Sequence, residues 1–422
     1  MKLVEFVSPT PHPLWELCPQ MGITDVIVKV NPELTGLPDP WKFETLASIV
    51  GRLKSAGLSV VGLEGDPFDM SPIKEFGVGE DFSHKDHKDH KDGLFTNDNC
   101  HNCSQITNTN STRSTCSTRL NDTGNTVKTY PSVLREEALA HYCELLESMG
   151  RLGIKLLCYN FMVGKGWSRT GVREGRGGAK ATYFSLDDFS HKDGLFTNDN
   201  CHNCSQITNA DSTRSTCSTR LNNPVNLVNP VKVNLILSHE QVWANYEYFI
   251  KAVMPTAEKL GIRMGLHPDD PCLDSLGGYA RIFGSIEAYD RAYSIYPSPS
   301  NAVTFCQANF KLMLTNDNCH NCSQIALADA ARHFGKRIAF IHIRDVEGSK
   351  TDFTELFHDQ GDVDQFALMR VYRELGLDVP VRGDHVPEMA YDRVLTPEGT
   401  PGYFTLGRLF ANGYLKALLQ GG

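Results

Sequence analysis

The sequence predicts an α/β protein folded as a (β/α)8 barrel, a TIM barrel with long insertions in its βα loops. Three observations support this fold class. Eight short, apolar, β-branched runs alternate with amphipathic helical stretches, polar residues gather where the later runs end, and near-identical segments interrupt the alternation. A doubly wound sheet is the alternative, but no Gly-rich phosphate turn follows the first run to support it.

The expected strands are spread along the whole chain, and each is a short run rich in Val, Ile, Leu or Phe. In order they are KLVEFV from Lys2, DVIVKV from Asp25, LSVVGLEG from Leu58, KLLCYNFM from Lys155, RMGLHPDD from Arg263, AVTFCQAN from Ala302, IAFIHIRDV from Ile338 and DVPVRGDH from Asp378. Because a (β/α)8 barrel needs eight parallel strands, this number agrees with one complete barrel.

Amphipathic helical segments separate these runs. The clearest span residues 40–57, 134–153 and 238–261. The last opens with Ser238 and Gln241 at the spacing of a capping box, and it closes with Lys259 and Gly261, which are typical helix-end residues. Such helices supply the crossovers that parallel strands require.

Composition bounds the class of protein. The 422 residues are expected to form a single TIM-barrel domain, 1–422. The hydrophobic fraction of 41% and the charged fraction of 22% are normal for a soluble protein. A net charge of −9 argues against nucleic acid or an anionic membrane as the main partner. The first residues lack an uninterrupted apolar run, and no stretch approaches the roughly 18–20 apolar residues of a membrane helix. We therefore expect a cytoplasmic protein with no nucleic-acid or membrane partner.

A repeated motif, TNDNCHNCSQI, begins at Thr96, Thr197 and Thr315. We expect the copies to lie in insertions at about 81–128, 188–234 and 315–325, after the third, fourth and sixth strands. The first two are rich in Asn, Ser, Thr and Asp, so they cannot bury enough surface to offset the entropy of ordering. We expect loops or disordered segments there.

Three interpretations of the repeats remain open. A zinc site would take its ligands from one copy: Cys100, Cys103 and Cys116, with His101 or His84. The second closing pair of a zinc ribbon is missing, however. A disulfide-bonded or glycosylated module is suggested by the sequon at 102–104, but no signal peptide is expected. We favour solvated insertions without essential chemistry.

The later strands end in polar residues, and in a barrel these ends meet at the catalytic face. The residues are Asn160 after the fourth strand, His267 after the fifth, Cys306 at the sixth, His342 and Arg344 at the seventh, and Asp384 and His385 at the eighth. Side chains alternate along a strand, so Phe340, His342 and Arg344 share one face and Ile341 and Ile343 the other. The same alternation opposes Cys306 to Phe305, and Asp384 to Val381.

The residue types at these ends are suited to a transition metal. Two imidazoles, a thiolate and a carboxylate come from His267, His342, Cys306 and Asp384. This mixed set suits Mn²⁺, Fe²⁺ or Zn²⁺ better than Mg²⁺ or Ca²⁺, which prefer oxygen ligands. A lone strand-end cysteine or histidine is more often a core residue, but four such residues on consecutive strands favour a metal site.

Seven motifs in order resemble the mannonate dehydratase family. They are LCYNFM (157–162), LHPDDP (266–271), FCQANF (305–310), HIRDVEG (342–348), FHDQGDVD (357–364), RGDHVPEM (382–389) and PGYFTLGRLFANGYLKALL (401–419). The resemblance covers nearly everything outside the repeats. It implies a xylose-isomerase-like barrel that dehydrates D-mannonate to 2-keto-3-deoxy-D-gluconate.

The resemblance also implies particular residues and partners. Its metal ligands match the same His267, Cys306, His342 and Asp384, and its usual ion is Mn²⁺, with Fe²⁺ or Co²⁺ sometimes effective. Tyr403 matches the family's catalytic partner, as an acid or as a polariser of the leaving hydroxyl. The expected partner is a small sugar acid, and we expect a homo-oligomer.

Other residues near the expected mouth receive roles from their chemistry. His385, next to Asp384, is the candidate base or acid for proton transfer. Asn160, Arg169 and Arg344 are candidates for binding the substrate's hydroxyls and carboxylate. Asp345 is expected to assist substrate binding by orienting Arg344 or a ligand imidazole.

Two other functions remain open from the sequence. A sugar isomerase of the same barrel would move hydrogen between C1 and C2 of an aldose, although the Cys306 ligand and the Asp384-His385 pair disfavour it. A non-catalytic barrel whose mouth is obstructed by the insertions is the third hypothesis. Product analysis separates the first two, and deletion of the insertions tests the third.

Overall fold

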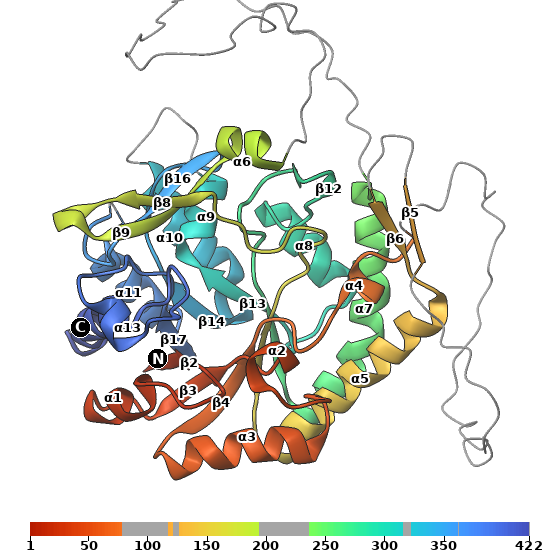
Figure 1. The fold of residues 1–422 in the computed structure, drawn as a ribbon, viewed down its shortest axis with the longest axis horizontal. Helices are drawn as coiled ribbons and strands as arrows, with labels where there is room; N and C mark the ends of the chain where they lie inside the picture. The colour runs from red at the N-terminus through yellow and green to blue at the C-terminus, as the bar shows by residue number, and fades with distance from the viewer. Residues whose placement is uncertain (78–116, 121–125, 194–235, 315–321, 362, 422) are drawn as a thin grey trace, which may run out of the picture.

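The computed structural model describes residues 1–77, 117–120, 126–193, 236–314, 322–361 and 363–421 (Figure 1). Its main sheet is a closed parallel barrel, with strand order β1-β17-β14-β13-β10-β7-β4-β3-β2. The first strand is in two pieces, β1 (Lys2–Leu3) and β2 (Glu5–Val7). Because β1 pairs with β17 and β2 pairs with β3, this divided strand closes the ring. The predicted barrel is confirmed.

The other barrel strands coincide with the seven remaining predicted runs. They are β3 (Asp25–Val28), β4 (Ser59–Glu64), β7 (Leu156–Tyr159), β10 (Arg263–Leu266), β13 (Asn301–Cys306), β14 (Ile338–Ile343) and β17 (Pro380–Gly383). Every pairing between neighbouring strands is parallel. The carboxyl ends of all these strands therefore lie at one face of the barrel.

Helices surround the strands (Figure 1). They are α1 (Leu14–Gln20), α2 (Pro32–Thr35), α3 (Phe43–Ser55), α4 (Ser71–Lys74), α5 (Ser132–Arg151), α6 (Leu186–Asp193), α7 (His239–Leu260), α8 (Ile286–Ile295), α9 (Gln307–Leu314), α10 (Cys322–Phe334), α11 (Gln365–Glu374), α12 (Asp392–Leu395) and α13 (Thr405–Gln420). Short 3₁₀ turns lie at Arg176–Gly178 and Gly335–Arg337. In the part of the chain described, none of these helices is both long and apolar enough to cross a membrane.

The predicted helix ends are confirmed at α7. Ser238 Oγ accepts a hydrogen bond from the Gln241 backbone N–H (3.3 Å), and Gln241 Oε1 accepts one from the Ser238 N–H (2.8 Å). This capping box satisfies two donors that the first turn would otherwise leave unpaired. Gly261 ends the helix with φ +61°, a left-handed conformation in which glycine carries no Cβ penalty.

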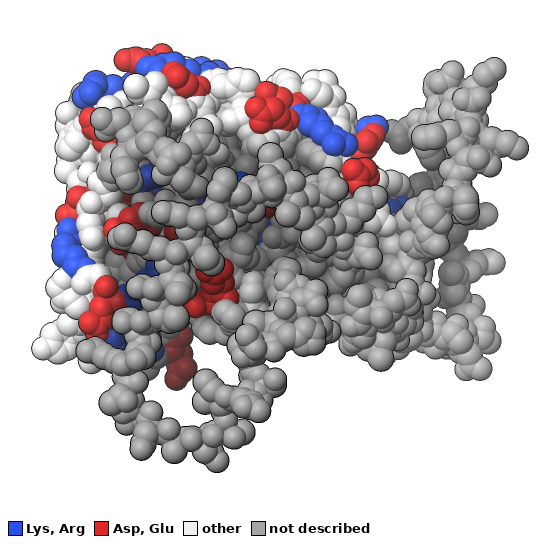
Figure 2. Space-filling view, turned by 90° about the horizontal axis from the view of Figure 1, so that it is seen from above, with Lys and Arg blue, Asp and Glu red and all other residues white. Residues whose placement is uncertain are grey.

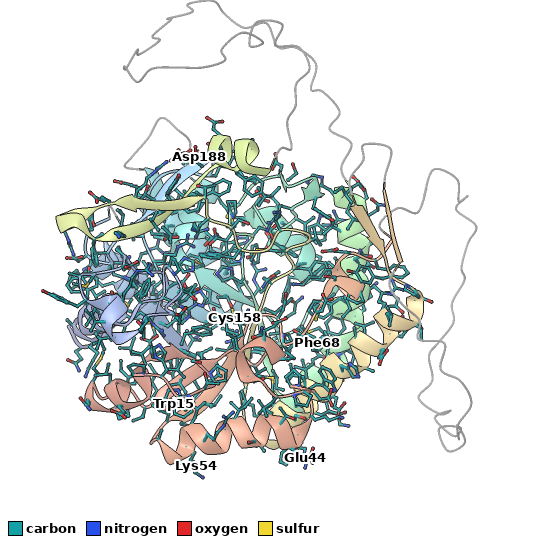
Figure 3. The ribbon with its side chains drawn as sticks, viewed as in Figure 1. Trp15, Glu44, Lys54, Phe68, Cys158 and Asp188 are labelled. Atoms are coloured by element: carbon teal, nitrogen blue, oxygen red, sulfur yellow. The ribbon has the colours of Figure 1, made fainter. Side chains whose placement is uncertain are left out.

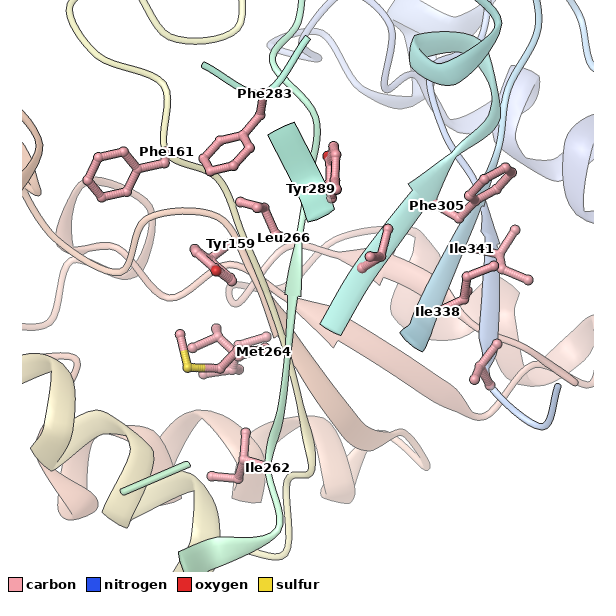
Figure 4. Close-up of a cluster of buried hydrophobic side chains, with 14 of the residues drawn as sticks. Tyr159, Phe161, Ile262, Met264, Leu266, Phe283, Tyr289, Phe305, Ile338 and Ile341 are labelled. Carbon is pink, nitrogen blue, oxygen red and sulfur yellow. The ribbon is translucent and has the colours of Figure 1, made fainter. Parts of the chain in front are cut away.

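The barrel wall separates two apolar layers. Ile27, Leu156 and Phe340 face the barrel interior, where they belong to one cluster of buried side chains. Ile341 and Phe305 belong to the larger cluster between strands and helices, shown in Figure 4. Neighbouring residues such as Phe340 and Ile341 thus take opposite sides, as the alternation along the strand predicts.

A second sheet of four antiparallel strands, not predicted from the sequence, adjoins the barrel at the upper left of Figure 1. It contains β8 (Gly171–Glu174), β9 (Lys180–Ser185), β15 (Val346–Ser349) and β16 (Asp352–Glu355), in the order β15-β16-β9-β8. Its strands come from the segments that follow β7 and β14, so the sheet belongs to the face where barrel strands end. We call it the lid sheet. A small hairpin, β11 (Ser275–Leu276) and β12 (Tyr279–Ala280), follows β10.

Most of the predicted insertions, and all repeat cysteines except Cys322, lie outside the described residues, so their zinc and disulfide interpretations do too. The expectation of loops or disorder in the first two insertions is wrong at two places. Strands β5 (Ser117–Leu120) and β6 (Thr126–Thr129) form an antiparallel hairpin, and α6 continues to Asp193. In the third insertion, α10 begins at Cys322. Near the start of α6, Tyr183 in β9 donates a 2.6 Å hydrogen bond to Asp188, so a local side-chain contact joins the helix to the strand before it. The insertion boundaries remain a prediction.

Basic and acidic side chains are interspersed on the described part of the surface seen in Figure 2. Several form exposed ion pairs, such as Arg173 with Asp352 (2.8 Å) and Arg176 with Asp359 (2.9 Å). Exposed pairs of this kind contribute about 0–1 kcal/mol each, so they have little influence on the fold. Burial of the two apolar layers is the larger contribution.

Gly62 in β4 provides a test of barrel packing. A Cβ there would lie 2.8 Å from Ile27 Cδ1 and 3.1 Å from the Leu156 carbonyl oxygen. We predict that Gly62→Ala lowers the free energy of unfolding by about 1–3 kcal/mol because it overpacks the barrel interior. Urea denaturation followed by circular dichroism measures the change.

The matched control is Gly51→Ala on α3, where an added Cβ has no heavy atom within 4 Å. A helical alanine is favoured over glycine, so this variant should gain about 0.5–1 kcal/mol. Equal effects of the two substitutions would contradict the packing described for Gly62.

Candidate active site

The polar strand ends converge on a hollow of about 170 Å³ at the barrel mouth. It is lined by Phe6, Lys29, Glu64, Gly65, Cys158, Tyr159, Asn160, Met162, Trp167, His267, Asp270, Arg382, Asp384, His385 and Tyr403. Figure 3 shows one of these residues, Cys158, near the middle of the barrel. Two larger hollows, of about 620 and 490 Å³, lie beside the mouth. We place the site in the smaller one because ionisable groups from several strands converge only there among the three.

Four of the predicted side chains form one group in this region. One ligand atom each from His267, Cys306, His342 and Asp384 lies within 4.8 Å of the other three. Cys306 Sγ is 4.0 Å from Asp384 Oδ2, and His342 Nδ1 is 3.8 Å from the same oxygen. The structure thus brings together residues from β10, β13, β14 and the end of β17, as the strand-end pattern predicts.

The two histidines of this group have ring nitrogens that can bind a cation. The His342 side chain is fully buried, and neither ring nitrogen has a hydrogen-bond partner among the described residues. The nearest carboxylate oxygens, on Glu64 and Asp384, are 3.6 and 3.8 Å away. His267 Nδ1 lies 2.8 Å from the Pro268 carbonyl oxygen, which requires Nδ1 to donate and leaves the Nε2 lone pair available. A mixed N, S and O donor set with an unpartnered buried imidazole fits a divalent transition metal.

Charge also favours ligation at Asp384. Burial alone would raise the pKa of this carboxyl, but the neighbouring His385 and Arg382 hold it well below its usual range. Arg382 Nη1 lies 2.9 Å from Asp384 Oδ1. The carboxylate is therefore ionised at neutral pH, which is the form that binds cations.

His385 lies between the Glu355 carboxylate and the Tyr403 hydroxyl. Its Nδ1 is 3.1 Å from Glu355 Oε1, and its Nε2 is 2.8 Å from the Tyr403 hydroxyl. Because a carboxylate can only accept, Nδ1 donates and Nε2 faces the hollow beside Tyr403. Burial, followed by the Asp384 carboxylate, raises the pKa of Tyr403 well above its usual value, so this side chain remains a phenol.

Comparison with known proteins decides the family. The sequence model described as D-mannonate dehydratase (UxuA) matches residues 122–421, which is more than half of the chain. The chain belongs to the D-mannonate dehydratase family. The resemblance recognised in the sequence motifs is therefore confirmed, and with it the class of hydro-lyases.

Individual relatives agree with this assignment. The mannonate dehydratase of Streptococcus equi subsp. zooepidemicus is 29% identical over 289 residues, which are 68% of this chain and 74% of that protein. Mannonate dehydratase 2 of Halalkalibacterium halodurans is 28% identical over 292 residues, 68% of this chain and 76% of that protein. The crystal structure of the mannonate dehydratase from Streptococcus suis serotype 2 has a TM-score of 0.67 at 21% identity, covering 100% of this chain and 94% of that one, so the fold is shared.

The two arginines proposed for substrate binding have buried partners in this member of the mannonate dehydratase family. Arg169 binds Asp270 (2.8 Å) and Glu355 (2.6 Å), and Arg344 binds the same two carboxylates (2.9 and 2.8 Å). All four side chains are 4% exposed or less. Neither arginine is among the residues that line the hollow, although Arg169 Nη2 lies 3.4 Å from His385 Nδ1. Their role in substrate binding stays a prediction.

Asp345 takes a different position from the one expected. Its carboxylate accepts hydrogen bonds from Lys311 Nζ (2.6 Å) and from the backbone N–H groups of Val346 and Val363 (2.8 and 3.0 Å). It follows Arg344 in the chain and points to the other side, as alternation requires. Its described bonds therefore hold backbone after β14, and none of them reaches Arg344 or a ligand imidazole.

Several residues of the mouth were missed in the sequence. Glu64, at the end of β4, accepts two hydrogen bonds from Arg382 (2.6 and 3.0 Å). Burial alone would raise the pKa of Glu64, but Arg382 and His342 outweigh that effect and lower it to about 2. Its place at a strand end was a usable signal. Asp270 lies within the quoted LHPDDP motif, whereas Glu355 lies in the unpredicted lid sheet and had no such signal.

Cys306 provides a test of the ligand group. We predict that Cys306→Ala weakens Mn²⁺ binding by more than about 100-fold, because even loss of an outer partner costs 10- to 100-fold. Equilibrium dialysis with metal analysis measures the affinity without an activity assay. Cys143→Ala, a half-buried cysteine outside the hollow, should bind as the unsubstituted protein does. Equal affinity in the two variants would remove Cys306 from the ligand group.

Proposed function

We propose that this protein converts D-mannonate to 2-keto-3-deoxy-D-gluconate and water. One observation carries the proposal: the four-residue group lies next to the His385–Tyr403 pair at the mouth of the barrel. The chain that forms this barrel belongs to the mannonate dehydratase family. The hollow is small, and its lining includes Lys29, Glu64, Asn160, His267, Asp384 and His385, which suit a sugar acid better than a larger apolar ligand. We expect the cation to be Mn²⁺, with Fe²⁺ or Co²⁺ as substitutes.

The reaction is a β-elimination. The C2–H bond breaks and its electrons form a C2–C3 double bond, while the C3–O bond breaks and hydroxide leaves as water after protonation. The resulting enol takes up a proton at C3 and loses the proton of its 2-hydroxyl group, which gives the 2-keto acid. Two protein groups are needed, one that removes the C2 proton and one that protonates the leaving oxygen.

His267, Cys306, His342 and Asp384 are the residues that would hold the cation. A divalent ion bound there supplies Lewis-acid stabilisation of the charge that develops on the substrate carboxylate as the C2 proton leaves. Asp384 and the thiolate of Cys306 would contribute negative charge, and His267 and His342 would contribute neutral imidazole nitrogens. Burial of His342 excludes water from that side of the site.

His385 is the proposed base and Tyr403 the proposed acid. Glu355 fixes the His385 ring through Nδ1 and stabilises the positive charge that the ring acquires with the proton. Tyr403 keeps its phenolic proton and lies 2.8 Å from His385 Nε2, so proton transfer between the two can restore their starting states. A homo-oligomer in the cytoplasm remains our expectation for the assembly.

Turnover of D-mannonate with Mn²⁺ tests the proposal. We predict that His385→Asn lowers kcat about 10²- to 10⁴-fold while metal content is unchanged, because the variant loses proton transfer and keeps the ligands. Product analysis measures the 2-keto-3-deoxy acid directly. Formation of a ketose from an aldose would support the isomerase hypothesis instead.

The control is His333→Asn, which alters an exposed histidine on α10 paired with Asp290. This variant should retain the unsubstituted rate, since it lies outside the hollow. Full activity in His385→Asn would exclude His385 as the base.

A further inference from the structure

Lys29 lies on the wall of the hollow opposite Cys306. It follows directly after β3, and in the barrel order three strands separate β3 from β13 on one side: β4, β7 and β10. On the other side lie β14, β17 and the divided first strand. Lys29 and Asp384 nevertheless line the same hollow, so a molecule bound there can reach both walls.

The local backbone makes room for the Lys29 side chain. A Cβ on Gly65 would lie 3.3 Å from Lys29 Cε and 3.4 Å from Cδ, so the aliphatic stem passes close over this glycine. Gly65 also has φ +88°, a conformation that disfavours other residues. The aliphatic stem of Lys29 is thus held against Gly65, and both residues line the hollow.

Lys29 differs from the other cations near the mouth. Arg382 is paired with Glu64 and Asp384, and Lys74 with Asp66 (2.7 Å). Within the described residues, no carboxylate forms an ion pair with Lys29, although the side chain is half-buried in a region that contains Glu64 and Asp384. Its three ammonium donors are therefore available to a bound molecule.

Asn160 adds a second donor on the same side. Its Oδ1 accepts hydrogen bonds from Lys74 Nζ (3.1 Å) and from the Met162 backbone N–H (3.1 Å). Because both partners are donors, the oxygen must face them, and the Nδ2 amide group is left for the hollow that Asn160 lines. Lys74 is thus a positioning residue for the Asn160 amide.

The geometry points to Lys29, together with the Asn160 amide, as the site that binds the C5 and C6 hydroxyl groups of the sugar acid and selects its chain length. This inference rests on the proposed function, in which the carboxylate and C2 lie at the wall that carries the four-residue group. The far end of the acid then extends to the opposite wall, where hydroxyl oxygens meet hydrogen-bond donors. Lys29 acts on specificity and takes no part in proton transfer.

The test compares two acids. L-Erythronate keeps the configuration of D-mannonate at C2 and C3 but lacks C5 and C6. We expect Lys29→Met to raise KM for D-mannonate about 10- to 100-fold, as for loss of a hydrogen bond to a charged group, with little change in kcat. KM for L-erythronate should remain unchanged, and Lys29→Arg should recover part of the D-mannonate affinity.

Binding is also measured without turnover. Calorimetric titration of D-mannonate into Mn²⁺-loaded His385→Asn should give a Kd that rises by the same factor when Lys29→Met is added. Lys54→Met is the matched control, because Lys54 lies on the outer side of α3, far from the mouth (Figure 3). Thermal melting checks each fold, and Lys29→Gln replaces Lys29→Met if that variant does not fold.

Several outcomes would overturn the inference. An equal rise in KM for both acids would place Lys29 at the carboxylate end, and unchanged values would remove it from the site. A fall in kcat alone would indicate a catalytic role instead. If the unsubstituted protein neither binds nor turns over either acid, the proposed function fails first; activity that is insensitive to Lys29 defeats only this inference.

Discussion

Buried ion pairs between the lid sheet and the barrel hold the mouth of this protein in place. Glu355 comes from β16 of the lid, Arg344 from the end of β14, and Asp270 from the segment after β10. Arg169, which follows β7, completes the alternating set. Burial costs each of these ions hydration, so removing any one would leave an uncompensated charge, at a cost of about 3–5 kcal/mol. This network therefore depends on all four residues together.

The same network determines how His385 is presented. Glu355 binds both arginines and still accepts from His385 Nδ1, and the arginines and His385 lower the pKa of Glu355 to about 2 against the effect of burial. A carboxylate that stays ionised keeps the ring in one tautomer. His385 Nε2, the nitrogen of the proposed base, is thereby directed at Tyr403 by a strand that belongs to the lid and not to the barrel.

The two walls of the hollow have different chemistry. One carries His267 and Asp384, which belong to the four-residue group, and suits a cation. The other carries Lys29 and the Asn160 amide, which donate hydrogen bonds in the arrangement seen here, and Glu64, whose carboxylate is paired with Arg382. A sugar acid has a chelating end and a hydroxyl-rich end, so the division of the mouth matches the division of the substrate. This match supports the proposed orientation of the acid.

The sequence alone determined the barrel and the four-residue group, for a physical reason. Parallel strands buried on both sides need short apolar runs, and alternation along them decides which residues face inward, so His342, Cys306 and Asp384 could be assigned to one face before any contact was known. Only the tertiary structure decided the partners. Glu355 is distant in the chain from Arg169 and His385, and the bonds of Asp345 and Arg344 depend on how loops fold over the mouth. Such contacts carry no periodic signal, because loops lack the repeating geometry that makes strands predictable.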